Sequence, residues 1–447
     1  MSNNYSLLST VKKYVSSSVL LIIATVCALI CANVPFVKDV YQRLWELPVS
    51  FSIGNYNFFS HQGHALSFMS FINDFLMAFF FLSVGLEIKR EFLIGELSSV
   101  KKAMLPIIGA CGGMLVPVLL FWAVCPGDPE MLRGVAIPMA TDIAFSLGVI
   151  SMFGKRVPIS LKIFLTALAV ADDLGGIIVI ALFYSEQVYW LFLILSLVIV
   201  AGLMIGNYFC VRSRTFYIVG GLILWFLMLN SGIHATISGV IVAFCVPASL
   251  KHGSSHYIER IRENINQFPI FEISSQNKTV VLSSEQLNIL KSIESASNHL
   301  ISPLQDLEDN LRTPINYLII PLFAFANAGV CFEGMHAADL ISGVGLSVVV
   351  GLFIGKFLGV LSFSWISIKL GIVNMPAGAT WKAFASVCML CGIGFTVSMF
   401  LADLSYSGTE NGAVLLNNAK LGILIGTILS AIAGSILLHI NLPKENS

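Results

Sequence analysis

The sequence predicts an all-α polytopic membrane protein. We expect about twelve transmembrane helices in an inverted-repeat fold, forming one integral membrane domain over residues 1–447. Three observations favour this class. Hydrophobic residues make up 56% of the chain and charged residues only 11%, with a mean hydropathy of +0.86, whereas soluble domains are about 25% charged. The apolar residues fall into runs long enough to cross a bilayer. Two runs, one in each half, are interrupted near their middle, which is typical of transporters built from inverted repeats.

Twelve apolar runs are the expected transmembrane helices. The first follows Lys12 and Lys13, as a signal peptide does, but it is long enough to span and no small-x-small cleavage site follows it cleanly. We therefore expect a retained first helix. The runs are 15–33, 67–88, 103–124, 133–153, 157–184, 188–208, 216–230, 233–250, 314–332, 342–368, 383–402 and 417–439.

The short loops between the runs differ in their content of Lys and Arg. One set of loops carries most of these residues, including Lys155 and Arg156, whereas the other carries little beyond Lys38, Arg43 and Arg133. Because cytoplasmic loops are enriched in positive residues, we expect both termini to be cytoplasmic. An even number of spans agrees with that orientation.

Two loops are unusual. Residues 48–61 alternate apolar and polar residues around Gly54-Asn55, which predicts a β-hairpin on the outer face. An isolated hairpin is only marginally stable, so we expect it to pair, for example with its copy in a second subunit. Residues 251–313 form a long, polar, Ser- and Asn-rich cytoplasmic loop, and 283–302 show helical periodicity. We expect a partly ordered helical insert there and no catalytic domain.

The composition also narrows the range of partners. The formal net charge is zero, so no nucleic-acid partner is indicated. Most of the nine cysteines lie inside apolar runs, and their spacing does not resemble a metal framework. We therefore expect no cofactor, and a lipid bilayer as the surroundings.

The chain is organised around the fifth run, which carries Asp172 and Asp173 near its middle. A helix rises about 1.5 Å per residue, so both carboxylates lie near the bilayer midplane. Placing one acidic side chain at that depth costs on the order of 3 kcal/mol. One member of the pair serving only as a buried, neutral packing acid is the alternative to a functional pair.

The fourth and eleventh runs are expected to be broken. Asp142 lies mid-span with Thr141 before it, and Pro138 disturbs the helix just upstream. The glycines of 391–396 form a second weak point at the same depth. Broken helices inside a membrane are tolerated where the freed backbone groups face protein or a cavity. We expect an ion site between the two breaks.

Lys356 lies in the middle of the tenth run and needs an acidic partner to stay charged. Neighbouring residues on a helix point in different directions, so either Asp172 or Asp173 can pair with it while the other faces an ion path. Carboxylates, the Thr141 hydroxyl and freed carbonyls are oxygen ligands that small hard cations prefer. A carboxylate binds either a proton or the cation, and this competition alone produces exchange. A purely structural salt bridge remains an alternative for Lys356.

At these residues the sequence resembles the NhaA family of bacterial Na⁺/H⁺ antiporters over nearly its whole length. Paired interrupted helices are themselves known from this family, so that pattern and the resemblance are not independent. The motifs that carry the resemblance are VGLEIKREF (84–92), ATDIAFSLG (140–148), ADDLGG (171–176), SGIHATISGVIV (231–242), PLFAFANAGV (321–330), GLFIGK (351–356) and CGIGFT (391–396).

The resemblance implies a fold and an activity. It implies twelve helices, of which the fourth and eleventh are unwound and cross at mid-membrane. It implies electrogenic, pH-regulated exchange of Na⁺ or Li⁺ for H⁺ in the bacterial inner membrane, serving sodium and pH homeostasis. It also implies a homodimer formed through the outer-face hairpin of residues 48–61.

The resemblance also implies residue roles in the ion site. Asp173 would be the principal cation and proton carboxylate, and Asp172 its partner, paired with Lys356. Asp142, with Thr141 beside it, would offset the helix dipole ends at the crossing.

Other roles would lie toward the two faces of the membrane. Glu87, Arg90 and Glu91 would belong to the cytoplasmic pH-response region, although a solvated helix end is the simpler reading of these residues. His234 is a further candidate for this group, or an interfacial histidine. Asp74 would lie in the outer funnel.

One segment departs from the family pattern. Residues 307–314 keep an acid, Glu308, but lack the histidines expected there, which bears on the pH profile and leaves the ion site untouched.

Two other functions are alternatives to antiport. A symporter of an organic solute would need a roomier polar site. An intramembrane aspartyl protease would use acids on two helices, as Asp142 and Asp172 are, but in a Gly-x-Gly-Asp context that this chain lacks.

Overall fold

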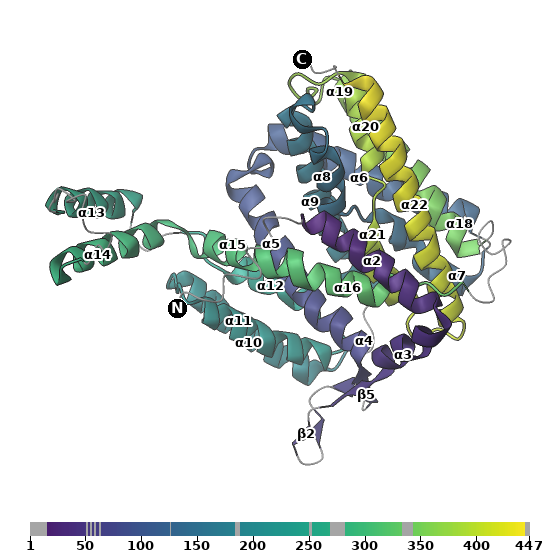
Figure 1. The fold of residues 1–447 in the computed structure, drawn as a ribbon, viewed down its shortest axis with the longest axis horizontal. Coiled ribbons are helices and arrows are strands. Elements are labelled where there is room, and N and C mark those ends of the chain that lie inside the picture. Colours follow the sequence, from purple (N-terminus) through teal and green to yellow (C-terminus); the bar gives the residue numbers. More distant parts are fainter. Residues whose placement is uncertain are drawn as a thin grey trace, which may run out of the picture.

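The computed structural model describes residues 16–50, 52–53, 56–57, 60–61, 64–125, 127–183, 188–249, 253–268, 282–332 and 343–442. The described chain is mostly helical (Figure 1). Six of its helices are long and apolar enough to cross a membrane. They are α4–η1–α5 (Phe68–Phe71, Ile72–Leu76, Met77–Ile94), α6 (Val100–Val124), α9 (Ile159–Phe183), α10 (Trp190–Tyr208), α18–η6–α19 (Gly343–Val350, Gly351–Gly355, Lys356–Lys369) and α22 (Gly412–Asn441).

Three bent helix pairs in the described chain raise the number of spans to nine if each pair is counted as one span. The 108° bend between α2 and α3 falls at Val34, which is extended and precedes a proline. The other two pairs each bend by 43°, and both belong to predicted broken runs. The pairs are α2 (Ser17–Asn33) with α3 (Pro35–Glu46), α7–η3 (Pro129–Leu132, Arg133–Met139) with α8 (Ile143–Ser151), and α20 (Trp381–Leu390) with α21 (Phe395–Tyr406).

Each of the twelve predicted runs contains helix, but several bounds differ. The eighth, predicted over 233–250, holds only α12 (Ile237–Cys245). It ends early because Lys89 of α5 donates to the carbonyls of Phe244 and Val246, at 2.7 and 2.5 Å, and Pro247 follows. The remaining helical elements of the body are η2 (Glu96–Ser98), η4 (Gly154–Arg156), α11 (Arg214–Leu229) and the continuous α15–η5–α16 (Pro303–Pro314, Ile315–Ile319, Ile320–Asn327).

Short strands lie between α3 and α4. β2 (Ser52–Ile53) and β3 (Tyr56–Asn57) pair antiparallel, with Ile53 opposite Tyr56. A second group has the order β1-β5-β4, and β2 lies beyond the helical body in Figure 1. The strands of this group are β1 (Pro48–Val49), β4 (Ser60–His61) and β5 (His64–Ser67).

Residues 251–313 contain two helices that extend away from the body, α13 (Ser254–Gln267) and α14 (Ser284–Leu300) (Figure 1). α14 begins with a capping box between Ser283 and Gln286. At its other end Arg212, from the α10–α11 connection, donates to the carbonyls of Asn298, His299 and Ile301 at 2.7–3.1 Å. The neighbouring Arg214 pairs with Asp306 of α15 at 2.5 Å. The α10–α11 connection therefore holds the base of the insert.

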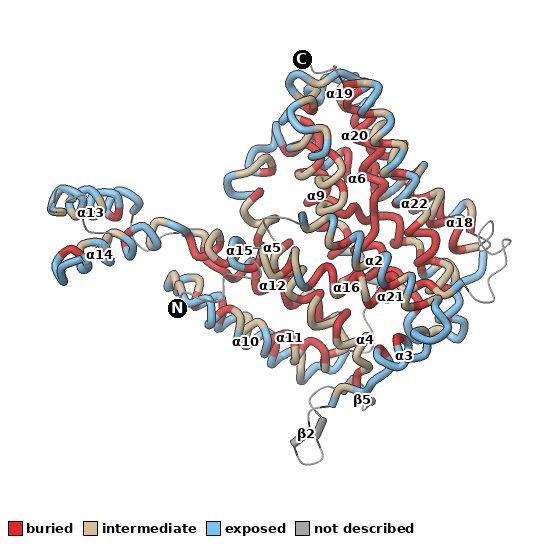
Figure 2. Tube along the Cα trace, viewed as in Figure 1, coloured by how far each residue is buried: buried red, intermediate tan, exposed pale blue. Residues whose placement is uncertain are grey.

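The buried core runs through α6, α20 and α21 (Figure 2). α21 buries ten of its twelve residues, whereas α10 buries only three of its nineteen. α6 and α19 approach each other at two glycines. A Cβ on Gly359 would lie 2.2 Å from the carbonyl oxygen of Gly112, and one on Gly112 would lie 2.3 Å from that of Gly359. This contact brings Lys356, one turn before Gly359, into the core.

Candidate functional site

A buried ion pair joins α9 and α19. The Nζ of Lys356 donates to Oδ2 of Asp172, and both side chains are fully buried. The π-helical turn η6 ends directly before Lys356, and such turns are common at functional sites. The residues alone left open which acid pairs with the lysine, and the family resemblance implied Asp172. In the structure it is Asp172.

The hydroxyl of Thr141 adds a third group to this pair. Its Oγ1 lies 2.7 Å from Oδ2 of Asp172 and 2.9 Å from the carbonyl oxygen of Cys391. A hydroxyl has one hydrogen, so the carboxylate and the carbonyl compete for it. Thr141 thus links the carboxylate of α9 to the breaks of both interrupted helices.

Asp142 lies where the two interrupted helix pairs meet. Its backbone N–H donates to the carbonyl of Ile393 at 2.6 Å. Its Oδ1 accepts from the N–H of Phe145 in the first turn of α8. Its Oδ2 accepts from the N–H and hydroxyl of Thr396 in the first turn of α21, at 3.1 and 2.7 Å. One carboxylate therefore serves the positive ends of two helices.

Asp173 differs from its neighbour. It is 4% exposed, and within the described part of the chain its Oδ1 has no hydrogen-bond partner. Oδ1 of Asp172 is likewise without a partner among those residues. A buried carboxylate oxygen that lacks a donor is unfavourable unless a proton or a cation occupies it. Carboxylate oxygens are among the ligands that small hard cations prefer.

Four charged side chains predicted to respond to pH form a second group. Arg90 Nε donates to both carboxylate oxygens of Glu308 at 3.1 Å, and its NH2 group lies 3.3 Å from Glu91 and 4.0 Å from Glu87. Burial raises the pKa of Glu308, and the Arg90 guanidinium acts in the opposite direction. The segment that departs from the family pattern thus still reaches α5.

Asp74 and His234 lie elsewhere. Asp74 belongs to the π-helical turn η1, and its carbonyl accepts from the indole of Trp225 at 3.2 Å. His234 Nδ1 lies 3.1 Å from the hydroxyl of Thr236, and its ring meets Phe400 edge-on. None of these contacts involves the Lys356–Asp172 pair.

Sequence reasoning missed several polar residues inside the body, among them Asn327, Asp403 and Lys420. Asp403 lies one residue beyond the eleventh predicted run, and Lys420 lies only a few residues into the twelfth. Their positions near the ends of these runs gave no sign in the sequence that they are enclosed by the protein. In the structure Lys420 is only 7% exposed.

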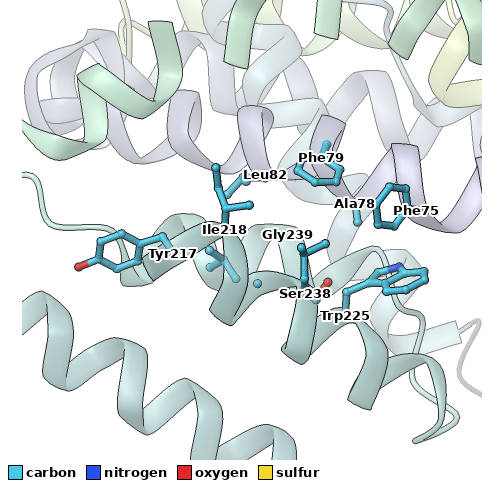
Figure 3. A pocket seen from close by; sticks show the side chains of 12 residues that line it. Phe75, Ala78, Phe79, Leu82, Tyr217, Ile218, Trp225, Ser238 and Gly239 are labelled. Carbon is cyan, nitrogen blue, oxygen red and sulfur yellow. The ribbon is translucent and has the colours of Figure 1, made fainter. Parts of the chain in front are cut away.

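An apolar pocket lies between α5, α11 and α12 (Figure 3). Aromatic and aliphatic side chains of η1 and α5, including Phe75 and Phe79, face Gly239 of α12 across it. Its lining contains neither a carboxylate nor a lysine, so this pocket is separate from the charged site and unsuited to small cations.

Comparisons with known proteins show the family to which the chain belongs. The family described as Na⁺/H⁺ antiporter 1 matches residues 9–438. A Phocaeicola vulgatus protein called Na(+)/H(+) antiporter NhaA is 51% identical over 442 residues, 99% of this chain and 97% of its own. Proteins of that name from Bacteroides thetaiotaomicron and Glaesserella parasuis are 53% and 40% identical, covering 96% and 95% of this chain and 96% and 94% of their own. The chain belongs to the Na⁺/H⁺ antiporter family and is a multi-pass membrane transporter, not an enzyme.

Proposed function

We propose that Na⁺ and H⁺ compete for the carboxylates of Asp172 and Asp173, and that this competition produces the exchange. The observation that carries the proposal is the unpaired buried Oδ1 of each acid within the described chain. Na⁺ bound at these oxygens leaves no place for a proton, and protonation removes the charge that holds Na⁺. The same groups can therefore carry either ion, one at a time.

Lys356 neutralises the empty site. Its ammonium pairs with Asp172. In the absence of Na⁺, the ammonium therefore neutralises the charge of Asp172, and Asp173 binds a proton. A cation entering beside Asp173 competes with the ammonium for Asp172. We propose that the exchange is electrogenic, with more protons moving inward than Na⁺ or Li⁺ moving outward.

Asp142 and Thr141 position the site. We propose that the fourth and eleventh spans of a twelve-helix inverted-repeat fold cross here. The support is the hydrogen bond from Asp142 N–H to the Ile393 carbonyl and the two helix starts that share its carboxylate. The carbonyls freed at the breaks supply further oxygen ligands.

Orientation follows from the loop charges. We propose that the protein lies in the bacterial inner membrane with both termini cytoplasmic, expels Na⁺ or Li⁺, and serves sodium and pH homeostasis. The group formed by Glu87, Arg90, Glu91 and Glu308 then faces the cytoplasm and responds to its pH. Asp74 would lie on the outer route, and His234 would act with the pH-response residues.

We also propose a homodimer formed through residues 48–61 on the outer face. Two-stranded ribbons are marginal alone. β2 and β3 form such a ribbon beyond the helical body, and pairing with a second copy would extend it.

The carboxylate proposal is tested in everted membrane vesicles from a host that lacks its own antiporters. Adding Na⁺ to vesicles with the natural protein should collapse the proton gradient, and Asp173→Asn should abolish this response at every pH from 7 to 9. Asn keeps the shape of the side chain and removes the charge and the titration. Asp128→Asn, an exposed acid that caps α7, is the matched control and should behave as the natural protein. Full exchange by a folded Asp173→Asn variant would contradict the role given to Asp173.

A further inference from the structure

A second polar group, made of two buried amides and a half-buried carboxylate, lies outside the Lys356 site. It contains the side chains of Asn73, Asn327 and Asp403, which come from η1, the end of α16 and α21. Asn73 Nδ2 donates to Oδ2 of Asp403 at 2.7 Å and to Oδ1 of Asn327 at 3.3 Å. Asn327 Nδ2 donates back to Oδ1 of Asn73 at 2.7 Å. Three helical segments thus converge on one carboxylate and two amides.

Lys420 of α22 adds a charge to this group. It is 7% exposed. Among the described residues its ammonium makes no hydrogen bond and no ion pair, and Asp403 is the charge that acts on it. A lysine this deeply buried without a partner is unfavourable. The Asp403 carboxylate is already bound by the Asn73 amide, so a neutral N–H donor and the Lys420 ammonium both act on it.

All four residues lie toward the end of the molecule that carries the strands. Asp403 belongs to the last turn of α21, and Lys420 follows only residues 407–411 and the first turns of α22. Asn327 ends α16, and Asn73 lies just after β5 and α4. In the orientation proposed above this is the outer half of the membrane, between the central carboxylates and the outer solution.

We infer that Asp403, with the amide oxygens of Asn73 and Asn327, forms a transient site for a monovalent cation on the outer side, and that Lys420 competes with the cation for Asp403. One carboxylate and two amide oxygens are ligands that Na⁺ accepts. Rotation of the Asn73 amide turns its oxygen toward Asp403 and breaks the three hydrogen bonds that join Asn73 to Asp403 and Asn327, and the bound cation then takes the place of these donors. In both places a buried lysine acts on a carboxylate that also accepts a hydrogen bond from a neutral donor, although only Lys356 is in direct contact with its acid.

The inference rests on the proposed orientation, and the test separates the two. Na⁺-dependent proton movement is measured in everted vesicles, where Na⁺ meets the cytoplasmic face, and in right-side-out vesicles, where it meets the outer face. Asp403→Asn should raise KM for Na⁺ several-fold from the outer face and leave KM from the cytoplasmic face unchanged. Lys420→Met should lower KM from the outer face, because the competitor is gone. Opposite shifts are not expected from loss of stability.

Asn327→Ala tests the same cation site with a variant that leaves every charge in place. It should raise KM from the outer face less than Asp403→Asn does, because it removes one neutral oxygen ligand. Asp128→Asn and Lys101→Met, both exposed, are the controls for removing an acid and a lysine.

Three outcomes would overturn the inference. They are an unchanged KM for outer Na⁺ in all three variants, an equal shift of KM from both faces, and a shift of KM in the same direction for Asp403→Asn and Lys420→Met. A shift confined to the cytoplasmic face would instead show that the proposed orientation is wrong. If the natural protein itself shows no exchange of Na⁺ for H⁺, that result would contradict the antiport assignment.

Discussion

Single residues decide where charge resides in the membrane. Asp142 holds the starts of α8 and α21, and Thr141 divides one hydrogen between a carboxylate and a carbonyl. The sequence predicted that charged residues gather at mid-membrane, because each is too costly to keep there without a function. It did not predict which acid meets Lys356 from the residues alone. That depends on the rotation of α9 about its axis, which packing sets.

Arg90 provides a test at this scale. Burial raises the pKa of Glu308, so the folded protein holds this proton more tightly than the unfolded chain, and the group's contribution to stability falls as pH rises through the raised pKa. Arg90→Leu removes the charge that opposes the rise. We expect the pKa of Glu308 to rise further and the pH profile of Na⁺ exchange to move to more alkaline pH.

The measurement is the Na⁺-induced collapse of the proton gradient across pH. Arg262→Leu, an exposed arginine of α13, is the control and should leave the profile in place. A profile for Arg90→Leu that is unchanged, or that moves to lower pH, would rule out Glu308 as the titrating group.

Elements explain how the charged residues reach one another. Runs of apolar residues located the six long apolar helices, and Pro138 and the glycines of 391–394 located the breaks, because those residues act through local backbone chemistry. The bounds were less accurate. The end of α12 is set by Lys89 on another helix, and the start of α15 lies in a segment too polar to be recognised as the beginning of a span. The predicted runs could not contain such information.

The α6–α19 contact gives a prediction for elements. Gly359→Ala places a Cβ 2.2 Å from the carbonyl oxygen of Gly112, so the two helices must separate. Overpacking of this kind costs about 1–3 kcal/mol. We expect a lower unfolding temperature in detergent and weaker Na⁺ exchange, because Lys356 moves with α19.

Gly202→Ala is the matched control, since a Cβ there meets nothing within 4 Å. Alanine favours a helix by about 1 kcal/mol over glycine, so this variant should be as stable as the natural protein or more so. Equal unfolding temperatures for the Gly359 and Gly202 variants would show that the close approach is unimportant.

The whole molecule consists of a helical body that buries charged side chains and of two parts outside it, the strands between α3 and α4 and the helices α13 and α14. The family resemblance and the comparisons give the same overall class, and the sequence indicated helix within 251–313 from periodicity alone. It did not indicate that Arg212 and Arg214 hold the insert. Contacts between residues so far apart in sequence leave no periodic signal.

The dimer proposal is tested on the whole molecule. Replacing residues 50–63 with a short Gly-Ser turn should convert the dimer to a monomer while each copy still exchanges Na⁺ for H⁺, because the charged site lies within one chain. Light scattering coupled to size exclusion measures the mass, and vesicle assays measure the exchange. A shortened protein that remains dimeric would place the interface elsewhere.

The Lys356–Asp172 pair has a consequence for how this sequence can change over generations. Losing either partner alone leaves a charge stranded in a medium that cannot hydrate it, a penalty of about 3–5 kcal/mol. Losing both together removes the penalty. For folding stability the two positions therefore form an epistatic unit, in which keeping both residues or exchanging both is tolerated, whereas the proposed exchange of ions requires Asp172 itself. The first single step away from the pair is the one that selection should remove.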